Sequence, residues 1–399
     1  MELSLDPAQW RERKGMGAIL AALGADQGLT RYVGGAVRDG LLQLPVNDID
    51  LATRLQPAEV VSRLEQAGIK AVPTGIDHGT VTAVSSGQPV EVTTLRRDVS
   101  TDGRRATVAF TDSWQEDAAR RDFTINALFA EPRTGEVFDY FGGLGDLATR
   151  RVRFIGDALQ RIAEDHLRIL RFFRFHARFG VGAPDSEALD ACTARANDLM
   201  ALSRERIADE LLKILALPDP AATAGLMLQR GILRPVLPEI EPQRLCDLEA
   251  LIAAEREAGV HGDGVRRLAA LLPRDPTIAA EVAGRLRLSN RARKRLVAAV
   301  SSGTGDSPQA RAYRDGVEAA MDQLLLAARA RDARALTDWT PPRLPIGGGV
   351  LVARGVQPGP LVARTLRAIE DAWVAAGFPD GDLFENLVNE AVSAALARG

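Results

Sequence analysis

Two aspartates in the run VNDIDLA, Asp48 and Asp50, are the residues whose type and spacing point most directly to chemistry. On an extended strand alternate side chains share a face, so these carboxylates would lie about 6 to 7 Å apart while Ile49 faces the core. Two carboxylates on one face are the ligands that a pair of Mg²⁺ ions needs beside a triphosphate. Glu91, in the strand-like run PVEVTTL, is a candidate third carboxylate, and an exposed strand glutamate is the open alternative.

A phosphate-binding pattern precedes the aspartates. Gly34 and Gly35 end a short apolar run, and glycines let backbone N–H groups approach a phosphate without a Cβ in the way. Arg38 then supplies a forked guanidinium suited to phosphate oxygens. A glycine pair alone is usually a turn, and a lone Asp-x-Asp is usually a solvated loop. Their combination within residues 32–53 therefore carries the prediction of a phosphate and metal site.

The segment EDAARRDFTINALF, residues 116–129, has a polar start followed by apolar residues. Arg121 and Asp122, which follow Arg120, are suited to hold a triphosphate and a ribose hydroxyl. The alternative is a helix N-terminus whose acids favour the helix dipole and whose arginines are simply solvated.

The segment EDHLRILRFFRFHARF, residues 164–179, has helical periodicity and an apolar stripe. Four polar residues advance by threes and predict a slanting row beside that stripe: Asp165, Arg168, Arg171 and Arg174. Asp165 accepts and Arg168 donates hydrogen bonds, so together they could present a fixed edge to a nucleobase. The other two arginines would remain for phosphates, and ion pairing at i, i+3 within the helix is the alternative.

The elements that must position these residues change character near residue 150. Before it, short β-branched runs alternate with turns and predict a small mixed sheet with helices. After it, amphipathic helical patterns dominate. We therefore predict an α+β fold with a mixed-sheet head and an all-α remainder. Proline and glycine punctuation gives four expected domains: a head at 1–148, a helical neck at 149–217, a helical body at 218–303 and a helical tail at 304–399.

The composition of the 399 residues, 26% charged and 46% hydrophobic, is typical of a soluble globular chain with several compact units. No uncharged stretch reaches the roughly 18 apolar residues of a membrane span, and the N-terminus lacks a secretory pattern, so we expect a cytoplasmic protein without membrane association. Cys192 and Cys246 are expected to be ordinary core residues. The net charge of −3 does not favour nucleic acid, but the arginine-rich stretch 150–180 could contact phosphates.

The motifs resemble, in order, those of the class II tRNA nucleotidyltransferase and poly(A) polymerase family of DNA polymerase β-like nucleotidyltransferases. GGAVRD with NDIDLAT resembles the metal and triphosphate motif, RRDFTINAL the ribose motif, and EDHLRILRFFRF the protein template for incoming bases. DYFGGLGDL, residues 139–147, resembles the hinge element between head and neck. LSRERIADELLKIL, residues 202–215, resembles the motif that closes the neck.

The resemblance implies a template-independent transferase that adds CCA to tRNA 3′ ends from CTP and ATP, with Mg²⁺ as cofactor. Asp48 and Asp50 would bind the metal, and Asp165 with Arg168 would read the base edges. The remaining nucleotide-binding positions would be Gly34, Gly35, Arg38, Arg121, Asp122, Arg171 and Arg174. The partner is the tRNA acceptor stem and 3′ end, bound through phosphates and shape. No obligatory protein partner is evident.

Several alternatives stay open within and outside this family. A poly(A) polymerase would carry a basic GRRF-like segment where this chain has GIDHGTV at 75–81, which favours CCA addition. The stretch STDGRRATVAF at 100–110 resembles the flexible element that CCA-adding and A-adding enzymes use to switch to ATP, which argues against an enzyme that adds CC only. An A-adding-only enzyme is the next rival after a poly(A) polymerase. GLGDLA at 143–148 fits a dinucleotide fingerprint and would indicate an oxidoreductase, although a flanking βαβ pattern is not evident. A non-catalytic tRNA binder would gain nothing from two carboxylates near RNA phosphates.

Overall fold

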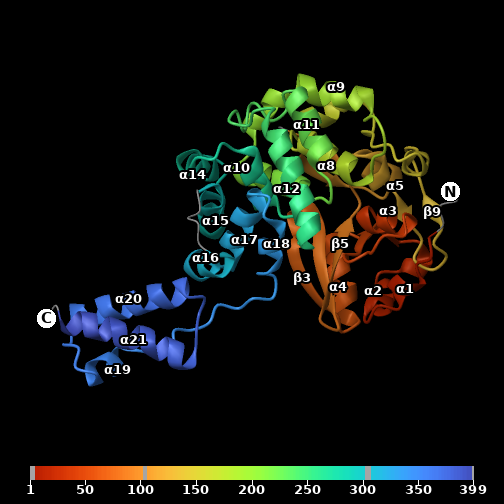
Figure 1. Ribbon diagram of the computed structural model, residues 1–399. Coiled ribbons are helices and arrows are strands. Elements are labelled where there is room, and N and C mark those ends of the chain that lie inside the picture. The colour runs from red at the N-terminus through yellow and green to blue at the C-terminus, as the bar shows by residue number, and fades with distance from the viewer. Residues whose placement is uncertain (1–4, 102–105, 302–306, 398–399) are drawn as a thin grey trace. The chain divides into compact units, whose positions relative to one another are not determined.

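Figure 1 shows the computed structural model, which describes residues 5–101, 106–301 and 307–397. Backbone contacts divide the chain into two compact units. The first consists of Met1–Glu210 with Arg230–Val236, and the second of Leu211–Gln229 with Leu237–Gly399. The four domain boundaries expected from the sequence stay predictions.

A mixed sheet forms the centre of the first unit, with the strand order β3-β4-β5-β2-β1-β8-β9. Its strands are β1 (Thr30–Val33), β2 (Asp50–Thr53), β3 (Lys70–Gly75), β4 (Thr80–Ser85), β5 (Gln88–Thr94), β8 (Phe129–Ala130) and β9 (Val137–Phe138). Only β2 and β5 pair in parallel among these strands, and their register sets Asp50 opposite Glu91. This one parallel pair is what brings two of the predicted acids together.

A separate antiparallel pair is formed by β6 (Arg96–Thr101) and β7 (Ala106–Phe110). The stretch 100–110, which resembles a flexible element, contains the last two residues of β6 and the whole of β7. Residues 102–105 of this stretch lie outside the described residues.

Short helices accompany the strands of the first unit, and several of them bury an apolar face against the sheet. They are α1 (Ala8–Arg11), α2 (Met16–Ala22), α3 (Gly35–Leu41), α4 (Pro57–Gln66), α5 (Trp114–Ala119) and α6 (Gly143–Ala148), with 3₁₀ turns at Ala25–Gln27, Ile76–His78 and Thr124–Asn126. Helix α4 starts with a proline at its first turn, where no N–H is needed, and packs on β3 and β4. Helix α2 packs on β4, and α3 on β1. Val33, Leu95, Trp114 and Phe129 belong to one buried cluster of this unit.

The first unit continues as helices: α7 (Ala158–Glu164), α8 (Arg168–Phe179), α9 (Ser186–Ala194), a 3₁₀ turn at Ala196–Ala201 and the start of α10 (Arg204–Leu215), whose residues from Leu211 belong to the second unit. Asp157 and Asp185 accept hydrogen bonds from the N–H group of the third residue of α7 and of α9, which sets where those helices begin. Helix α8 buries Phe172, Phe173 and Phe175, so its aromatic face belongs to the core.

The second unit is helical: α11 (Ala221–Gln229), α12 (Arg244–Ala258), α13 (Gly264–Leu271), α14 (Pro276–Arg285), α15 (Asn290–Val300), α16 (Pro308–Asp315), α17 (Val317–Leu326), α18 (Ala330–Arg334), α19 (Gly348–Ala353), α20 (Pro360–Ala375) and α21 (Gly381–Leu396). Trp373, Ile369 and Val388 belong to a buried cluster formed mainly by α19 to α21. The predicted α+β class, with a mixed-sheet head and a helical remainder, is confirmed.

The structure also bears on the burial of the two cysteines and on the presence of membrane-spanning helices. Cys192 is buried as predicted, but Cys246 is exposed, so the expectation that it is a core residue is wrong. In the described ranges, no helix has the length and apolar character needed to cross a bilayer.

Candidate active site

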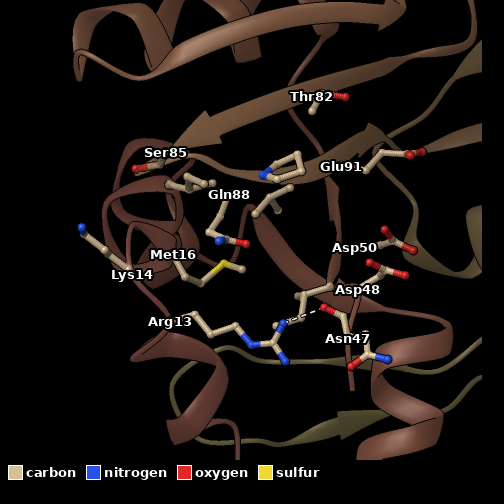
Figure 2. A pocket seen from close by; sticks show the side chains of 14 residues that line it. Arg13, Lys14, Met16, Asn47, Asp48, Asp50, Thr82, Ser85, Gln88 and Glu91 are labelled. Atoms are coloured by element: carbon tan, nitrogen blue, oxygen red, sulfur yellow. Dashed lines mark hydrogen bonds between the residues drawn. The ribbon is translucent and has the colours of Figure 1, made fainter. Parts of the chain in front are cut away.

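Asp48, Asp50 and Glu91 line one cavity of about 540 Å³ in the first unit. Figure 2 shows the three carboxylates on the same side of this cavity, with Asp48 and Asp50 close together. Asp50 is the first residue of β2, and Glu91 is its partner on the parallel strand β5. Because side chains opposite one another in a sheet project to the same face, the register itself makes this acidic pair. The sequence-based expectation that Glu91 joins the aspartates is consistent with this geometry.

The strand begins later than the sequence indicated. Asp48 lies two residues before β2, in the segment 44–49, which belongs to no helix or strand. The same-face argument therefore does not apply to Asp48 and Asp50. Ile49 is nevertheless buried as expected, and its burial helps to fix the course of the chain between the two acids.

The electrostatics of the cavity disfavour three negative charges in the absence of a cation. Removal of water raises the pKa of Asp50 to about 6, and the neighbouring charges of Glu91 and Asp48 act in the same direction. The positive charge of Arg121 partly opposes these effects. Carboxylate oxygens in such a position fit a divalent metal ion, which would neutralise them. Within the described ranges, however, no three acidic, histidine or cysteine side chains are already grouped closely enough to hold an ion.

The glycine turn lies next to two of the predicted arginines. Gly34 has φ +69° and ψ −123°, a conformation that L side chains rarely adopt, and it caps the start of α3. A Cβ at Gly34 would come within 3.4 Å of Nη1 of Arg121, and one at Gly35 within 3.6 Å of Nη2 of Arg38. The Gly34 N–H donates to the carbonyl of Leu128, so this amide is not free for a phosphate. Any contribution of this turn to phosphate binding would therefore come from the space that the missing Cβ leaves, and not from a hydrogen bond of the Gly34 amide.

Arg38 is buried and engaged inside the protein. Its guanidinium donates to Asp39 at 2.8 Å and to Oδ1 of Asn126, and it lies 4.1 Å from the ring centre of Phe179. Burial lowers the pKa of Arg38, and Asp39 partly restores it. In this structure Arg38 braces the glycine turn, and a phosphate would have to compete with these partners.

The alternative of a helix N-terminus holds for the acids, since Glu116 and Asp117 lie in the first turn of α5. Arg120, Arg121 and Asp122 follow that helix, and the two arginines are ion-paired rather than simply solvated. Arg120 and Arg121 both pair with buried Asp117, each at 2.8 Å. Burial alone would raise the pKa of Asp117, but the two arginines outweigh it and lower that pKa. Arg121 thus reaches from this pair toward the glycine turn and the charge of Asp50.

Asp122 is turned inward. It accepts hydrogen bonds from the N–H of Phe123 at 2.8 Å and from Nδ2 of Asn126 at 3.0 Å, and pairs with Arg171 at 2.6 Å. Burial would raise the pKa of Asp122, but Arg171 and the hydrogen bonds outweigh it and lower the pKa. The carboxylate therefore joins the residues after α5 to α8.

The predicted row of four residues does not lie on one helix. Helix α7 ends at Glu164 and α8 starts at Arg168, so Asp165 lies in the turn between them. Asp165 pairs with Arg206 of α10 at 2.9 Å, and Arg168 pairs with Glu164 at 2.7 Å. Asp165 and Arg168 therefore do not form one row, and each has a different partner.

Arg171 and Arg174 meet at one buried acid of α10, Glu210. Arg174 pairs with Glu210 at 2.6 Å, and Arg171 lies 3.9 Å from it. Both guanidiniums also lie over the ring of Phe175. Sequence reasoning did not single out Glu210 or Arg206, although their spacing of four on a helix would place them on one face.

Comparisons with known proteins identify the family of this chain. Residues 30–153 match the Poly A polymerase head domain, and residues 183–244 match the probable RNA and SrmB-binding site of polymerase A. A CCA-adding enzyme of Streptococcus gordonii is 33% identical over 95% of this chain and 97% of its own length. The mitochondrial CCA tRNA nucleotidyltransferase 1 of mouse is 49% identical, but the match covers 46% of this chain and 43% of the mouse protein. The alignment thus spans less than half of that relative.

The solved structures with a similar fold include the Bacillus stearothermophilus CCA-adding enzyme in complex with CTP, with a TM-score of 0.73, 26% identity and coverage of 96% of this chain and 98% of that one. The Thermotoga maritima CCA-adding enzyme complexed with tRNA has a TM-score of 0.67 at 19% identity, covers 99% of this chain and 100% of that one, and shows the shared fold. The glycine turn does not itself line the acidic cavity, and Arg121 connects the two through its proximity to Gly34 and its charge effect on Asp50. Together with the matched head domain, the mixed sheet places the first unit in the nucleotidyltransferase class. The chain belongs to the class II tRNA nucleotidyltransferase and poly(A) polymerase family, as its motifs indicated, and this family generally uses a divalent metal.

Proposed function

We propose that this protein adds cytidine, cytidine and adenosine to tRNA 3′ ends, with CTP and ATP as substrates and pyrophosphate as product. The observation that carries the proposal is the meeting of Asp48, Asp50 and Glu91 in one cavity, with Arg121 close to Asp50 and to the glycine turn. The relatives that match nearly the whole chain are CCA-adding enzymes, which supports this acceptor and these nucleotides.

Mg²⁺ is the proposed cofactor, with Asp48 and Asp50 as its ligands and Glu91 as the third carboxylate. When bound, it supplies a lowered pKa for the attacking 3′-hydroxyl and neutralises charge on the leaving pyrophosphate. The protein's own residues place the acids on one wall of the cavity. Arg121, fixed by Asp117, adds positive charge on the side of the glycine turn, where the triphosphate is proposed to lie.

Nucleobase selection is proposed for the residues around α8, with different roles for exposed and buried side chains. The Asp165 and Arg171 side chains are 31% and 32% exposed, whereas that of Arg168 is 11% exposed. All four side chains are ion-paired, but Asp165 and Arg171 present more surface to a base edge. The Arg168 and Arg174 side chains are more enclosed, at 11% and 16% exposed, so we assign them mainly to holding α8 and its neighbours.

Gly34, Gly35, Arg38 and Asp122 are proposed to shape the triphosphate and ribose side of the site. In the structure Arg38 and Asp122 act through neighbours, since both are buried and hydrogen-bonded. We further propose that the protein is cytoplasmic and that it binds tRNA through the acceptor stem. The proposed reaction requires no protein partner.

Rival functions differ in what they require. A poly(A) polymerase or an A-adding-only enzyme would share the chemistry and differ in acceptor and nucleotide order. The dinucleotide-binding alternative loses its structural basis, because GLGDLA forms the short helix α6 and the preceding strand β9 pairs antiparallel with β8.

A primer-extension experiment tests the proposal. Purified protein with Mg²⁺ is given tRNA transcripts that end before CCA, after C and after CC, each with CTP, with ATP or with both. Extension that stops at CCA supports the proposal. A long A-tail on any RNA would indicate a poly(A) polymerase, addition of A to the CC-ended tRNA alone would indicate an A-adding enzyme, and no incorporation by folded protein would refute nucleotidyl transfer.

A further inference from the structure

The segment that carries Asp48 is held from outside the sheet by an arginine of the N-terminal region. Arg13 lies between α1 and α2, and its Nη1 donates to the carbonyl of Asn47 at 2.8 Å. Its Nη2 donates to the carbonyl of Val46. Figure 2 shows Arg13 extended along the bottom of the cavity toward Asn47, next to Asp48. One guanidinium thus holds two consecutive carbonyl groups directly before the acid.

This support matters because of where Asp48 lies. Residues 44–49 form no helix or strand, so sheet hydrogen bonds begin to fix the chain only at Asp50. Asp48 is exposed at the cavity, where solvent and the charge of Asp50 both favour its displacement. A charge-assisted pair of hydrogen bonds to the two preceding carbonyls restrains the backbone that places this carboxylate.

The base of Arg13 is itself anchored on two sides. Before it, Trp10 is buried and packs edge-on against Tyr32 of β1, with ring centres 5.1 Å apart. After it, Gly15 packs so closely on the end of β4 that a Cβ there would clash with the side chain of Ser85. The turn between α1 and α2 is therefore held against the sheet. The backbone of Arg13 is thus already placed so that its side chain can extend to Val46 and Asn47.

We propose that Arg13 is a positioning residue that places Asp48 for metal binding by holding the backbone of Val46 and Asn47. The proposal rests on the proposed function, in which Asp48 is a metal ligand. The head-domain match starts at residue 30, so Arg13 lies outside the part of the chain that this family model covers.

The test compares Arg13→Ala and Arg13→Lys with wild type in the full-length protein. Arg11→Ala is the matched control, because Arg11 is an exposed arginine of α1 whose hydrogen bond goes to the carbonyl of Arg133 instead. In metal-free protein, hydrogen–deuterium exchange of the peptide containing residues 46–49 should become several-fold faster in Arg13→Ala, with peptides of α8 unchanged. Mn²⁺ binding, followed by electron paramagnetic resonance of the free ion, should weaken.

Steady-state primer extension supplies the second readout. In Arg13→Ala, kcat should fall about tenfold with the KM for CTP changed less than about twofold, as expected for loss of charge-assisted hydrogen bonds that act on the acids and not on the nucleotide. The half-saturating Mg²⁺ concentration should rise. Arg13→Lys should be intermediate because a single ammonium keeps one donor group near the carbonyls, and added guanidinium ion should partly restore Arg13→Ala.

The outcomes separate this proposal from the proposed function. A wild-type protein that incorporates nothing would refute nucleotidyl transfer, and the exchange data would still report on the Arg13 contact. An active wild type whose Arg13→Ala variant keeps its kcat, metal affinity and local exchange would overturn the positioning role. Faster exchange throughout the head, without a local maximum at 46–49, would also overturn it, because Arg13 would then stabilise the fold in general.

Discussion

Replacement of Asp50 by asparagine should stabilise the metal-free protein at about pH 7.5. Asp50 has a usual pKa of 3.8, and removal of water together with Glu91 raises it to about 6 in the folded protein. Above that pKa the folded state holds an ionised carboxylate that the unfolded chain accommodates better. An asparagine side chain would keep the shape and remove the charge, so the Asp50→Asn variant should unfold at a higher temperature than wild type.

The expected gain in stability of Asp50→Asn follows from the rise in the pKa of Asp50 and from the exposure of this side chain to solvent. A rise of about two pKa units corresponds to about 3 kcal/mol. Asp50 is exposed at the cavity, so solvent screening reduces this to about 1 kcal/mol. For a unit of this size, that difference is about 2 to 4 °C in Tm.

Because the pKa of Asp50 is raised and not lowered on folding, the direction of the pH dependence of stability is also determined. The folded protein binds more protons than the unfolded chain between pH 3.8 and about 6, so the stability contributed by Asp50 is lost as pH rises through this window. The gain in free energy of unfolding of Asp50→Asn over wild type should therefore reach its full value at about pH 7.5 and become smaller toward pH 4. Thermal unfolding followed by circular dichroism in EDTA measures it, with Glu65→Gln on the exposed face of α4 as the control. An Asp50→Asn variant that is less stable than wild type at pH 7.5, or whose advantage grows as pH falls, would refute the reasoning.

Three further predictions concern other parts of the first unit. Gly34→Ala should lower stability by about 1 to 3 kcal/mol and reduce incorporation, because the backbone conformation excludes a Cβ and Arg121 lies beside it; chemical denaturation and primer extension measure both effects. Asp122→Ala should cost about 2 to 4 kcal/mol, since it leaves half-buried Arg171 and buried Asn126 without their shared acceptor, and a stability near wild type in urea unfolding would contradict this. Binding of tRNA, measured by fluorescence anisotropy, should weaken at least tenfold between about 50 and 200 mM salt if several phosphates are contacted, and an unchanged Kd would count against phosphate tracking.

The sequence predicted the strand parts of the head where β-branched residues alternate. The runs RYV, TVTAV and VEV fall in β1, β4 and β5. The pattern does not identify the strand at Lys70–Gly75, because its alternation is broken by Pro73 and a glycine, and it is an outer strand of the sheet that depends on β4 for pairing. The hydrophobic pattern likewise does not predict the register of the sheet. No local feature of VEVTTL shows that this strand pairs in parallel with the strand DLAT.

The acids of the candidate site could be named from the sequence, although their role stays a prediction, whereas the contacts of the site could not. Asp50 and Glu91 are register partners that line one cavity, in keeping with the period-two pattern that placed Glu91 on the face opposite the core. The helical row from Asp165 was wrong, because periodicity does not reveal that the chain turns at 165–167 and starts a new helix. The partners of Arg171 and Arg174 come from residues about 36 to 49 positions away, and only the tertiary fold selects them.

The parallel pairing of β2 with β5 has a consequence for how the protein is made. Antiparallel neighbours can form from a hairpin, but a parallel pair needs a long crossover, here the stretch through α4, β3 and β4. On a ribosome, Asp48 and Asp50 emerge well before Glu91, and until β5 has followed them into the sheet the aspartates have no acidic neighbour across the strands. The three carboxylates therefore come together only when β5 pairs with β2, so the cost of their repulsion arises after the segments of β1 to β4 have been made and not when the aspartates first emerge.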